Sequence, residues 1–237
     1  MKHAYEILFS FHDRTDLSVD TMLRQLLQFV APLQNLSPSL NDWLLGGETK
    51  EEALLYEVFK GYEPTTSAKA VLETQLKGKI DPRCIVIWNG RDGHEGASVQ
   101  FIGRPKDKTS LVTLVGRPKS FSSDWHLVVD ALMVGASIWS PSYITVESNG
   151  YFERKTFKDR PGVGWMLYLP KVLSASQVPE ARALVPVMSA DKKQTGTIIV
   201  SVTDDAFSDE NPEHVKIANA IEIRLVDQDL LPRYSEL

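Results

Sequence analysis

Glu153-Arg154-Lys155 is the triplet whose residue types and spacing most directly suggest catalysis. A carboxylate two residues before a lysine is one half of a metal-dependent nuclease site, in which the acid binds a divalent ion and the lysine supports the attacking water. A second acid must come from a neighbouring strand. Asp130 is expected on a helix and Glu147 on the same hairpin as the triplet, so neither supplies it. Because this second acid is missing, a nuclease that uses Glu153 and Lys155 is only the alternative to a function without catalysis.

Residues 151–160 around this triplet mix aromatic and basic side chains, the combination that stacks on and neutralises single-stranded nucleic acid. Acidic residues lie among them, and the whole chain carries 26 basic and 31 acidic residues, a net charge of −5. Nucleic-acid-binding domains are usually strongly basic. We therefore expect residues 151–160 to form a solvated hairpin arm, and we expect no nucleic-acid partner.

The loop of residues 89–96 places an acid, a base and a histidine between two expected strands. Its Asn, Asp and Gly residues are typical of a β-hairpin connection, because these residues adopt the backbone conformations of tight turns. We expect a turn here rather than an active site.

Other catalytic and ligand-binding motifs are missing from the sequence. The five histidines do not pair at the spacings that place two metal ligands on one helix face or hairpin. There is no phosphate-binding glycine loop, no nucleophile elbow and no Cys-x-x-Cys pair. The one cysteine, Cys84, lies in an apolar run and is expected to be a buried thiol. The sequence therefore predicts no catalytic residue, no metal and no cofactor, and it favours a binding protein or adaptor over an enzyme.

A cluster of acids near the C-terminus is the best candidate for a partner surface. Residues 204–213 contain five carboxylates and no basic residue. Unpaired like charges repel, so such a cluster suits a positively charged partner or a solvated loop. An aromatic residue among the acids resembles the apolar anchors at interface centres. The predicted contact residues are Asp204, Asp205, Phe207, Asp209 and Glu210.

The elements that must position these residues follow from hydrophobic periodicity and turn residues. We expect helices at residues 18–31, 51–59, 66–77, 125–136 and 212–228. Residues 221–225 within the last helix also alternate as a strand would, so a strand there is the alternative. Strands are expected at residues 5–11, 84–88, 98–102, 111–115, 143–147, 165–169, 184–188 and 197–203.

This order predicts an α+β fold of antiparallel β-sheets flanked by helices, since three successive strands disfavour a doubly wound parallel sheet. The chain of 237 residues is expected to form one unit, and its two similar halves suggest two tightly packed lobes at 1–117 and 118–237. With 43% hydrophobic residues and no long apolar stretch, it is expected to be a globular, cytoplasmic protein with no membrane partner. We expect a monomer when free.

Residues 159–170, Asp-Arg-Pro-Gly-Val-Gly-Trp-Met-Leu-Tyr-Leu-Pro, resemble the immunity protein 52 family of bacterial proteins encoded beside polymorphic toxins. The surroundings agree, because residues 125–132, Trp139, Tyr143 and the helix start at residues 211–215 resemble the same family in order and spacing. The resemblance covers most of the chain from Cys84 onward.

This resemblance implies a non-enzymatic antitoxin that binds and neutralises a cognate nuclease toxin of the restriction-endonuclease-like class, often delivered by type VI secretion. An acidic surface would suit such a partner, because the substrate groove of a nuclease must be basic. The motif around Trp165 and Tyr168 is expected to belong to the core rather than to the contact surface.

Overall fold

A nine-stranded sheet forms the centre of the molecule in the computed structural model, which describes residues 4–12, 16–35, 37–116 and 124–237. Its strand order is β10-β11-β9-β8-β1-β7-β6-β5-β2, and all of its paired strands are antiparallel. The strands are β1 Tyr5–His12, β2 Leu44–Leu45, β5 Arg83–Trp88, β6 Ala97–Gly103, β7 Thr109–Gly116, β8 Tyr143–Ser148, β9 Met166–Leu169, β10 Ala183–Met188 and β11 Gln194–Val200. A separate ribbon pairs β3 Phe59–Lys60 with β4 Glu63–Pro64.

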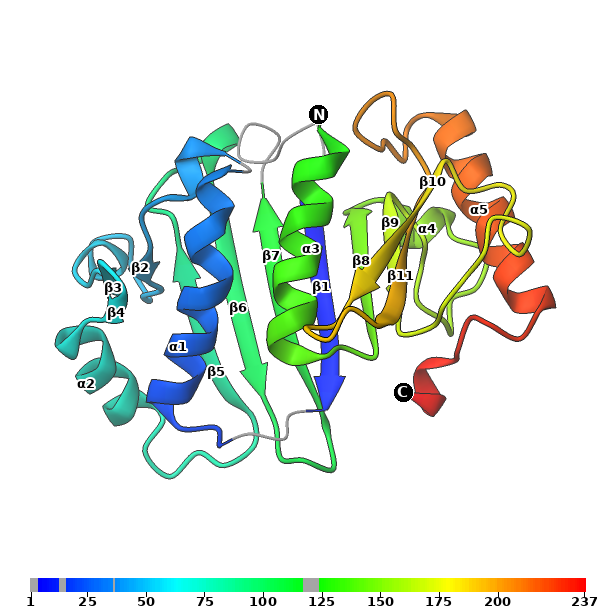
Figure 1. Ribbon diagram of the computed structural model, residues 1–237. Coiled ribbons are helices and arrows are strands. Elements are labelled where there is room, and N and C mark those ends of the chain that lie inside the picture. Colours follow the sequence, from blue (N-terminus) through cyan, green and yellow to red (C-terminus); the bar gives the residue numbers. More distant parts are fainter. Residues whose placement is uncertain (1–3, 13–15, 36, 117–123) are drawn as a thin grey trace.

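Helices flank this sheet, so the predicted α+β class is confirmed (Figure 1). They are α1 Val19–Val30, α2 Thr66–Gln75, α3 Trp125–Trp139, α4 Tyr151–Arg154 and α5 Pro212–Asp227. Short 3-10 turns occur at η1 Ala31–Asn35, η2 Pro38–Leu40, η3 Glu52–Leu54, η4 Gly93–Glu95 and η5 Tyr234–Glu236. The helix predicted at residues 51–59 is wrong, since the η3 turn is the only helical structure there and β3 begins at Phe59. The strand alternative at residues 221–225 is also excluded, because these residues lie within α5.

β1 joins the two halves of the chain. It pairs with β7 on one side and with β8 on the other. The strands of residues 1–117 and of residues 118–237 therefore belong to one continuous sheet, although the boundary itself lies outside the described residues. The division into two lobes stays a prediction.

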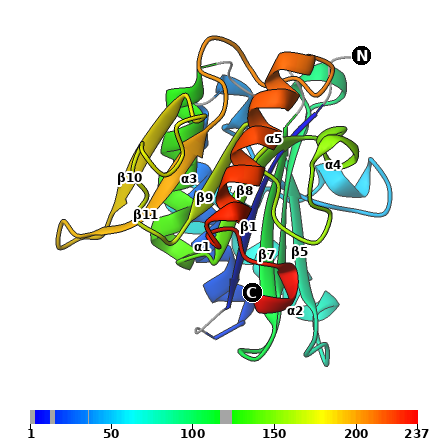
Figure 2. The same ribbon diagram turned by 90° about the vertical axis from the view of Figure 1, so that its right-hand side faces the viewer.

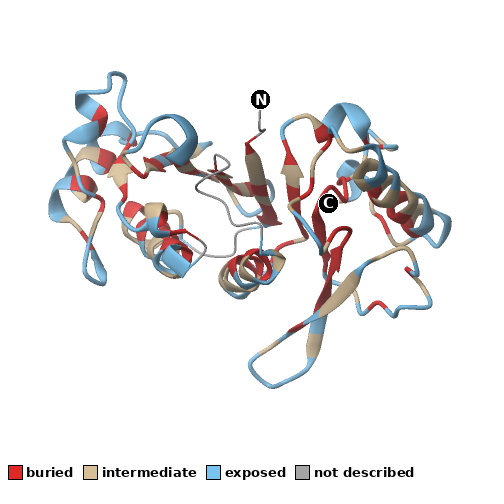
Figure 3. Cartoon of the chain, turned by 90° about the horizontal axis from the view of Figure 1, so that it is seen from above, coloured by how far each residue is buried: buried red, intermediate tan, exposed pale blue. Residues whose placement is uncertain are grey.

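α1 and α3 pack side by side on one face of the sheet, where the apolar core lies. Alternate residues of β1 point toward them, as the two-residue period of a strand requires. Phe9 and Trp139 belong to an aromatic cluster with ring-centre distances of 5.2–6.2 Å, completed by Phe11, Phe29 and Phe101. Seen from above, the buried residues of the helices face the sheet and the exposed ones face outward (Figure 3).

Gly135 sets how closely α3 approaches β1. A Cβ atom at this position would lie 2.1 Å from Cε1 of Phe9, which is well inside van der Waals contact. Any larger residue would push the helix away from the strand, so this glycine is required by packing rather than by its backbone conformation.

The opposite face of the sheet is covered unevenly. α4 lies on the other side of β1 and β8 from α1 and α3 (Figure 2). Over β5, β6 and β7 the side chains on this face are partly or fully exposed, among them Val86, Ile102 and Leu111. Cys84 shares this face and is half-buried, so the prediction of a buried thiol is wrong.

Residues 151–160 do not form the predicted hairpin arm. They begin with α4 and continue as a loop, because Tyr151 and Lys155 are buried rather than solvated. The amide of Lys155 donates to the Tyr151 carbonyl at 3.0 Å and closes the single helical turn. This loop brings together the side chains described next.

Candidate functional site

Glu153 and Lys155 lie in different environments and do not form one site. The side chain of Glu153 is 82% exposed, whereas Lys155 is 4% exposed. The Lys155 ammonium donates to the Arg160 carbonyl at 2.7 Å and to the Tyr234 hydroxyl at 3.1 Å. Within the described ranges, no group of three or more His, Cys, Asp or Glu side chains is arranged to bind a metal. The geometry therefore gives no support to a nuclease based on this pair.

Glu222 on α5 is the centre of a buried polar network. It is 1% exposed, and its carboxylate accepts hydrogen bonds from the Tyr151 hydroxyl at 2.7 Å, the Thr156 amide at 2.8 Å and the Val163 amide at 3.1 Å. A buried carboxylate needs such donors to replace water. Glu222 thus attaches the loop between α4 and β9 to α5.

The C-terminal segment holds the same loop from the other side. Arg160 donates to the carbonyl of Leu231, and Asp159 forms an ion pair with Arg233 at 3.0 Å. The amide of Tyr234 donates to the Asp159 carbonyl at 2.9 Å. Residues 159–164 are therefore fixed between α5 and the chain end.

Glu6 and Glu147 lie side by side on neighbouring strands of the sheet. They are register partners of β1 and β8, which places both side chains on the same face. No hydrogen bond or ion pair joins either carboxylate to another residue of the described chain. Burial raises the pKa of Glu147 to about 7, with contributions from Glu222 and Glu6 and with Lys155 opposing the shift. Burial also raises the pKa of Glu6.

The glycines of residues 162–164 make room for Glu147. A Cβ atom at Gly162 would lie 2.4 Å from Oε1 of Glu147, and one at Gly164 would lie 2.8 Å from its Cγ. Gly164 also has a φ of +47°, which side-chain-bearing residues rarely adopt. The motif that carries the family resemblance thus encloses Glu147 as well as supplying core residues such as Trp165, which is fully buried.

Glu6, Glu147 and Lys155 line a solvent-open groove of about 520 Å³ on the face of the sheet away from α1 and α3. Glu6 and Glu147 lie on its floor, and Lys155 lies at one side. Burial lowers the pKa of the Lys155 ammonium, while the carboxylates of Glu147 and Glu222 oppose this shift. The remaining lining residues are Leu8, Tyr143, Thr145, Ser148, Asn149, Phe152 and Tyr234.

The five predicted contact residues lie in the loop after β11, which we call the acid loop, residues 204–210, and two of them are buried. Phe207 is fully buried with its ring 5.2 Å from that of Tyr151, because an apolar ring is more stable in the core than in water. Asp209 is 7% exposed and accepts a hydrogen bond from the Ser148 hydroxyl at 2.5 Å. Neither side chain offers a surface to a partner. The exposed acids of the loop are Asp204, Asp205 and Glu210.

The acid loop and the groove are neighbours at the same end of β1 and β8. Ser148 lines the groove and also donates to Asp209. The Tyr5 hydroxyl donates to the Phe207 carbonyl at 3.0 Å, so the start of β1 also contacts the acid loop. The acid loop is thus attached to the sheet where β1 begins and β8 ends.

The loop of residues 89–96 connects β5 and β6, as predicted. The Asn89 amide group donates to the carbonyls of Ser39 and Glu95 and accepts from the Ala97 amide. Asp92 pairs with Lys50, and Arg91 pairs with Glu95 at 3.5 Å. Its charged groups are therefore used in surface pairs that hold the turn.

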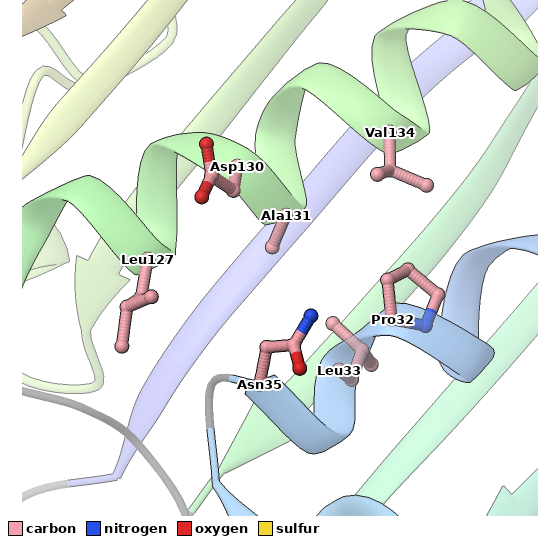
Figure 4. A pocket seen from close by; sticks show the side chains of 7 residues that line it. All are labelled: Pro32, Leu33, Asn35, Leu127, Asp130, Ala131 and Val134. Atoms are coloured by element: carbon pink, nitrogen blue, oxygen red, sulfur yellow. The ribbon is translucent and has the colours of Figure 1, made fainter.

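A small pocket of about 50 Å³ lies between η1 and α3 (Figure 4). Its lining is mainly apolar, and Asp130 is the one charged residue among those labelled. It offers no convergent polar groups, so it is not the candidate site. Separately, no helix in the described part of the chain is long and apolar enough to cross a bilayer.

The positions of Glu6, Glu147 and Glu222 in the sequence do not predict that these three residues lie near one another. They come from distant segments, and pairing of β1 with β8 is not encoded in any local pattern. One pattern in the sequence does indicate that Glu222 is buried, because Glu222 falls on the apolar side of α5 with Ala218, Ile221 and Leu225. An acid on a buried helix face marks a polar network.

Comparison with known proteins agrees with this architecture. The fold is similar to that of the Pseudomonas aeruginosa T6SS protein PA0821, with a TM-score of 0.58 and 11% identity, covering 94% of this chain and 73% of that one. That identity supports the likeness of fold alone. No curated protein matches the sequence. A family model described as immunity protein 52 matches residues 11–233, nearly the whole chain, so the chain belongs to the immunity protein 52 family.

Proposed function

We propose that this chain binds a cognate nuclease toxin of the restriction-endonuclease-like class and neutralises it without catalysis. The toxin would be a type VI secretion effector, and the chain, a monomer when free, would protect the producing cell from within its cytoplasm. The observation that carries this proposal is the family match over residues 11–233. The similarity in fold to a T6SS protein supports the secretion context.

The distribution of charge supports a basic partner. Residues 204–237 contain nine acidic and three basic residues and account for the whole excess of acid in the chain. Asp204, Asp205 and Glu210 are exposed, and their loop is joined through Asp209 to Ser148, which lines the groove that contains Glu6 and Glu147. Such an arrangement would accelerate association with the basic groove of a nuclease and would cover it.

Coexpression with the toxin encoded by the neighbouring gene tests the proposal. We expect the chain to restore growth and to elute with the toxin's nuclease domain as one complex in size-exclusion chromatography. A variant of the toxin lacking its nuclease domain serves as the control for the contact region. Continued toxicity together with separate elution of the two proteins would refute the proposed function.

A further inference from the structure

The groove contains more negative than positive side chains. Two carboxylates and one ammonium line it, from Glu6, Glu147 and Lys155, and the buried carboxylate of Glu222 lies close behind Glu147. Glu222 is satisfied by three hydrogen-bond donors, and Lys155 donates to an oxygen of each of two residues. Glu6 and Glu147 remain without a hydrogen bond or ion pair among the described residues, although they occupy directly opposite positions of two strands. Like charges at such positions destabilise a sheet.

The other walls of the groove suit a long cationic side chain. Leu8 lies two residues from Glu6 on the same face of β1, Tyr143 lies further along β8, and the half-exposed rings of Phe152 and Tyr234, which we call the rim rings, complete this part of the lining. Apolar and aromatic surface of this kind holds the aliphatic stem of arginine or lysine while its charged end reaches an acid. Lys155 already uses the two rim rings, since its nitrogen lies 5.0 Å from the centre of Phe152 and 5.2 Å from that of Tyr234. An additional cation must therefore sit between Glu6 and Glu147.

We propose that this groove receives an arginine or lysine side chain of the toxin's nuclease domain, whose charged end binds between the carboxylates of Glu6 and Glu147. This inference rests on the proposed function and names the chemistry of the contact. The volume of about 520 Å³ and the opening to solvent permit entry of such a side chain. A phosphate or another anion is disfavoured there by the same two carboxylates.

The proposal predicts a pH dependence of binding. Glu147 is faced by Glu6 from β1, Tyr151 from α4, Lys155 from the following loop, Glu222 from α5 and Tyr234 from the C-terminal segment. Because burial raises the pKa of Glu147 to about 7, part of the population is protonated near neutral pH. A bound cation favours the ionised form, so binding releases a proton and affinity rises between pH 6 and pH 8.

Calorimetric titration of the purified nuclease domain into four forms of the full chain tests this contact. The forms are the wild type, Glu6→Gln, Glu147→Gln and the neighbouring control Glu153→Gln, whose side chain is exposed. At pH 8 we expect each groove variant to bind about 10-fold or more weakly, and the control to stay within about 2-fold of the wild type. Glu147→Gln should also lose the rise in affinity between pH 6 and pH 8. Circular dichroism establishes that each variant is folded.

The outcomes separate the two proposals. Wild-type affinity and wild-type pH dependence in folded Glu6→Gln and Glu147→Gln would overturn the cation site and leave the immunity function standing. A wild-type chain that does not bind the nuclease domain would overturn both. Sedimentation of the chain alone provides the last comparison, since a dimer that is lost in the groove variants would assign the groove to a second copy and also overturn the proposal.

Discussion

The hydroxyl of Tyr151 donates a 2.7 Å hydrogen bond to the carboxylate of Glu222, which lies 71 residues later in the chain. Both side chains are buried, and Tyr151 also packs its ring against Phe207 of the acid loop. Through these two contacts, Tyr151 connects α4 with α5 and with the acid loop. Burial and the Glu222 charge raise the pKa of the Tyr151 hydroxyl well above its usual range, which keeps it a hydrogen-bond donor at all physiological pH values.

Removal of the Glu222 carboxylate should destabilise the fold. Glu222→Ala leaves two backbone amides without their acceptor and leaves the Tyr151 hydroxyl the longer hydrogen bond to Oδ1 of Asn219 at 3.2 Å, so we expect the free energy of unfolding to fall by about 3 kcal/mol. Urea denaturation measures this loss. Asp227→Ala, an exposed acid on the same helix, should change stability by less than about 0.5 kcal/mol. Equal effects of the two substitutions would contradict the role of the network.

Much of the fold follows from local sequence pattern. The strands β5, β6 and β7 are short apolar or alternating runs separated by turn residues, and α1 repeats its buried residues at the helical period behind Ser18, which caps it. The hairpin arm predicted at residues 151–160 was wrong, because tertiary contacts bury Tyr151 and Lys155 in a segment whose composition indicates solvent exposure. The helix predicted at residues 51–59 was also wrong, since this helix-forming run makes only the single 3-10 turn at Glu52–Leu54.

Glu147 should make stability depend on pH. Its pKa is raised in the folded state, so its contribution is fully present below the unfolded value and is lost as the pH rises toward about 7. Relative to Glu147→Gln, the wild type should lose about 2–3 kcal/mol between pH 5 and pH 8, given about 1.4 kcal/mol per unit of pKa shift. Urea denaturation at four pH values measures the difference. Parallel pH curves for the two proteins would show that this carboxyl is not perturbed.

Gly135→Ala should destabilise the contact between α3 and β1. Alanine favours the helical backbone over glycine by about 1 kcal/mol. Its methyl group would overlap the Phe9 ring, however, and overpacking of this kind lowers stability by typically about 1–3 kcal/mol. We expect a net loss of stability on thermal or chemical unfolding. Ser137→Ala on the exposed side of α3 is the matched control and should be neutral or stabilising. A stabilised Gly135→Ala variant would show that the helix moves away at no cost.

The exposed acids of the acid loop should contribute to toxin binding through charge. The pair Asp204→Lys and Asp205→Lys should weaken binding about 10-fold at low salt and reduce its salt dependence, because the attraction between opposite charges is screened by ions. Glu48→Lys with Glu51→Lys makes the same change in net charge near the β2 edge of the sheet. If both pairs have the same effect, the acid loop is not a specific contact.

The candidate site itself was only partly predictable from sequence. The run of acids identified the loop of residues 204–210, but the burial of Phe207 and Asp209 depends on Tyr151 and Ser148 from a different segment. The opposition of Glu6 and Glu147 depends on β1 lying between β7 and β8, a pairing over more than a hundred residues of sequence. Local pattern contains no information on such long-range register.

Inhibition of the toxin's nuclease activity by the purified chain tests the central claim most directly. DNA cleavage by the nuclease domain is measured while the chain is added in increasing amounts, with heat-unfolded chain as the control. We expect cleavage to fall to background once the chain saturates the nuclease domain, and the purified complex to remain inactive. Undiminished cleavage at a large excess of folded chain would contradict an immunity function.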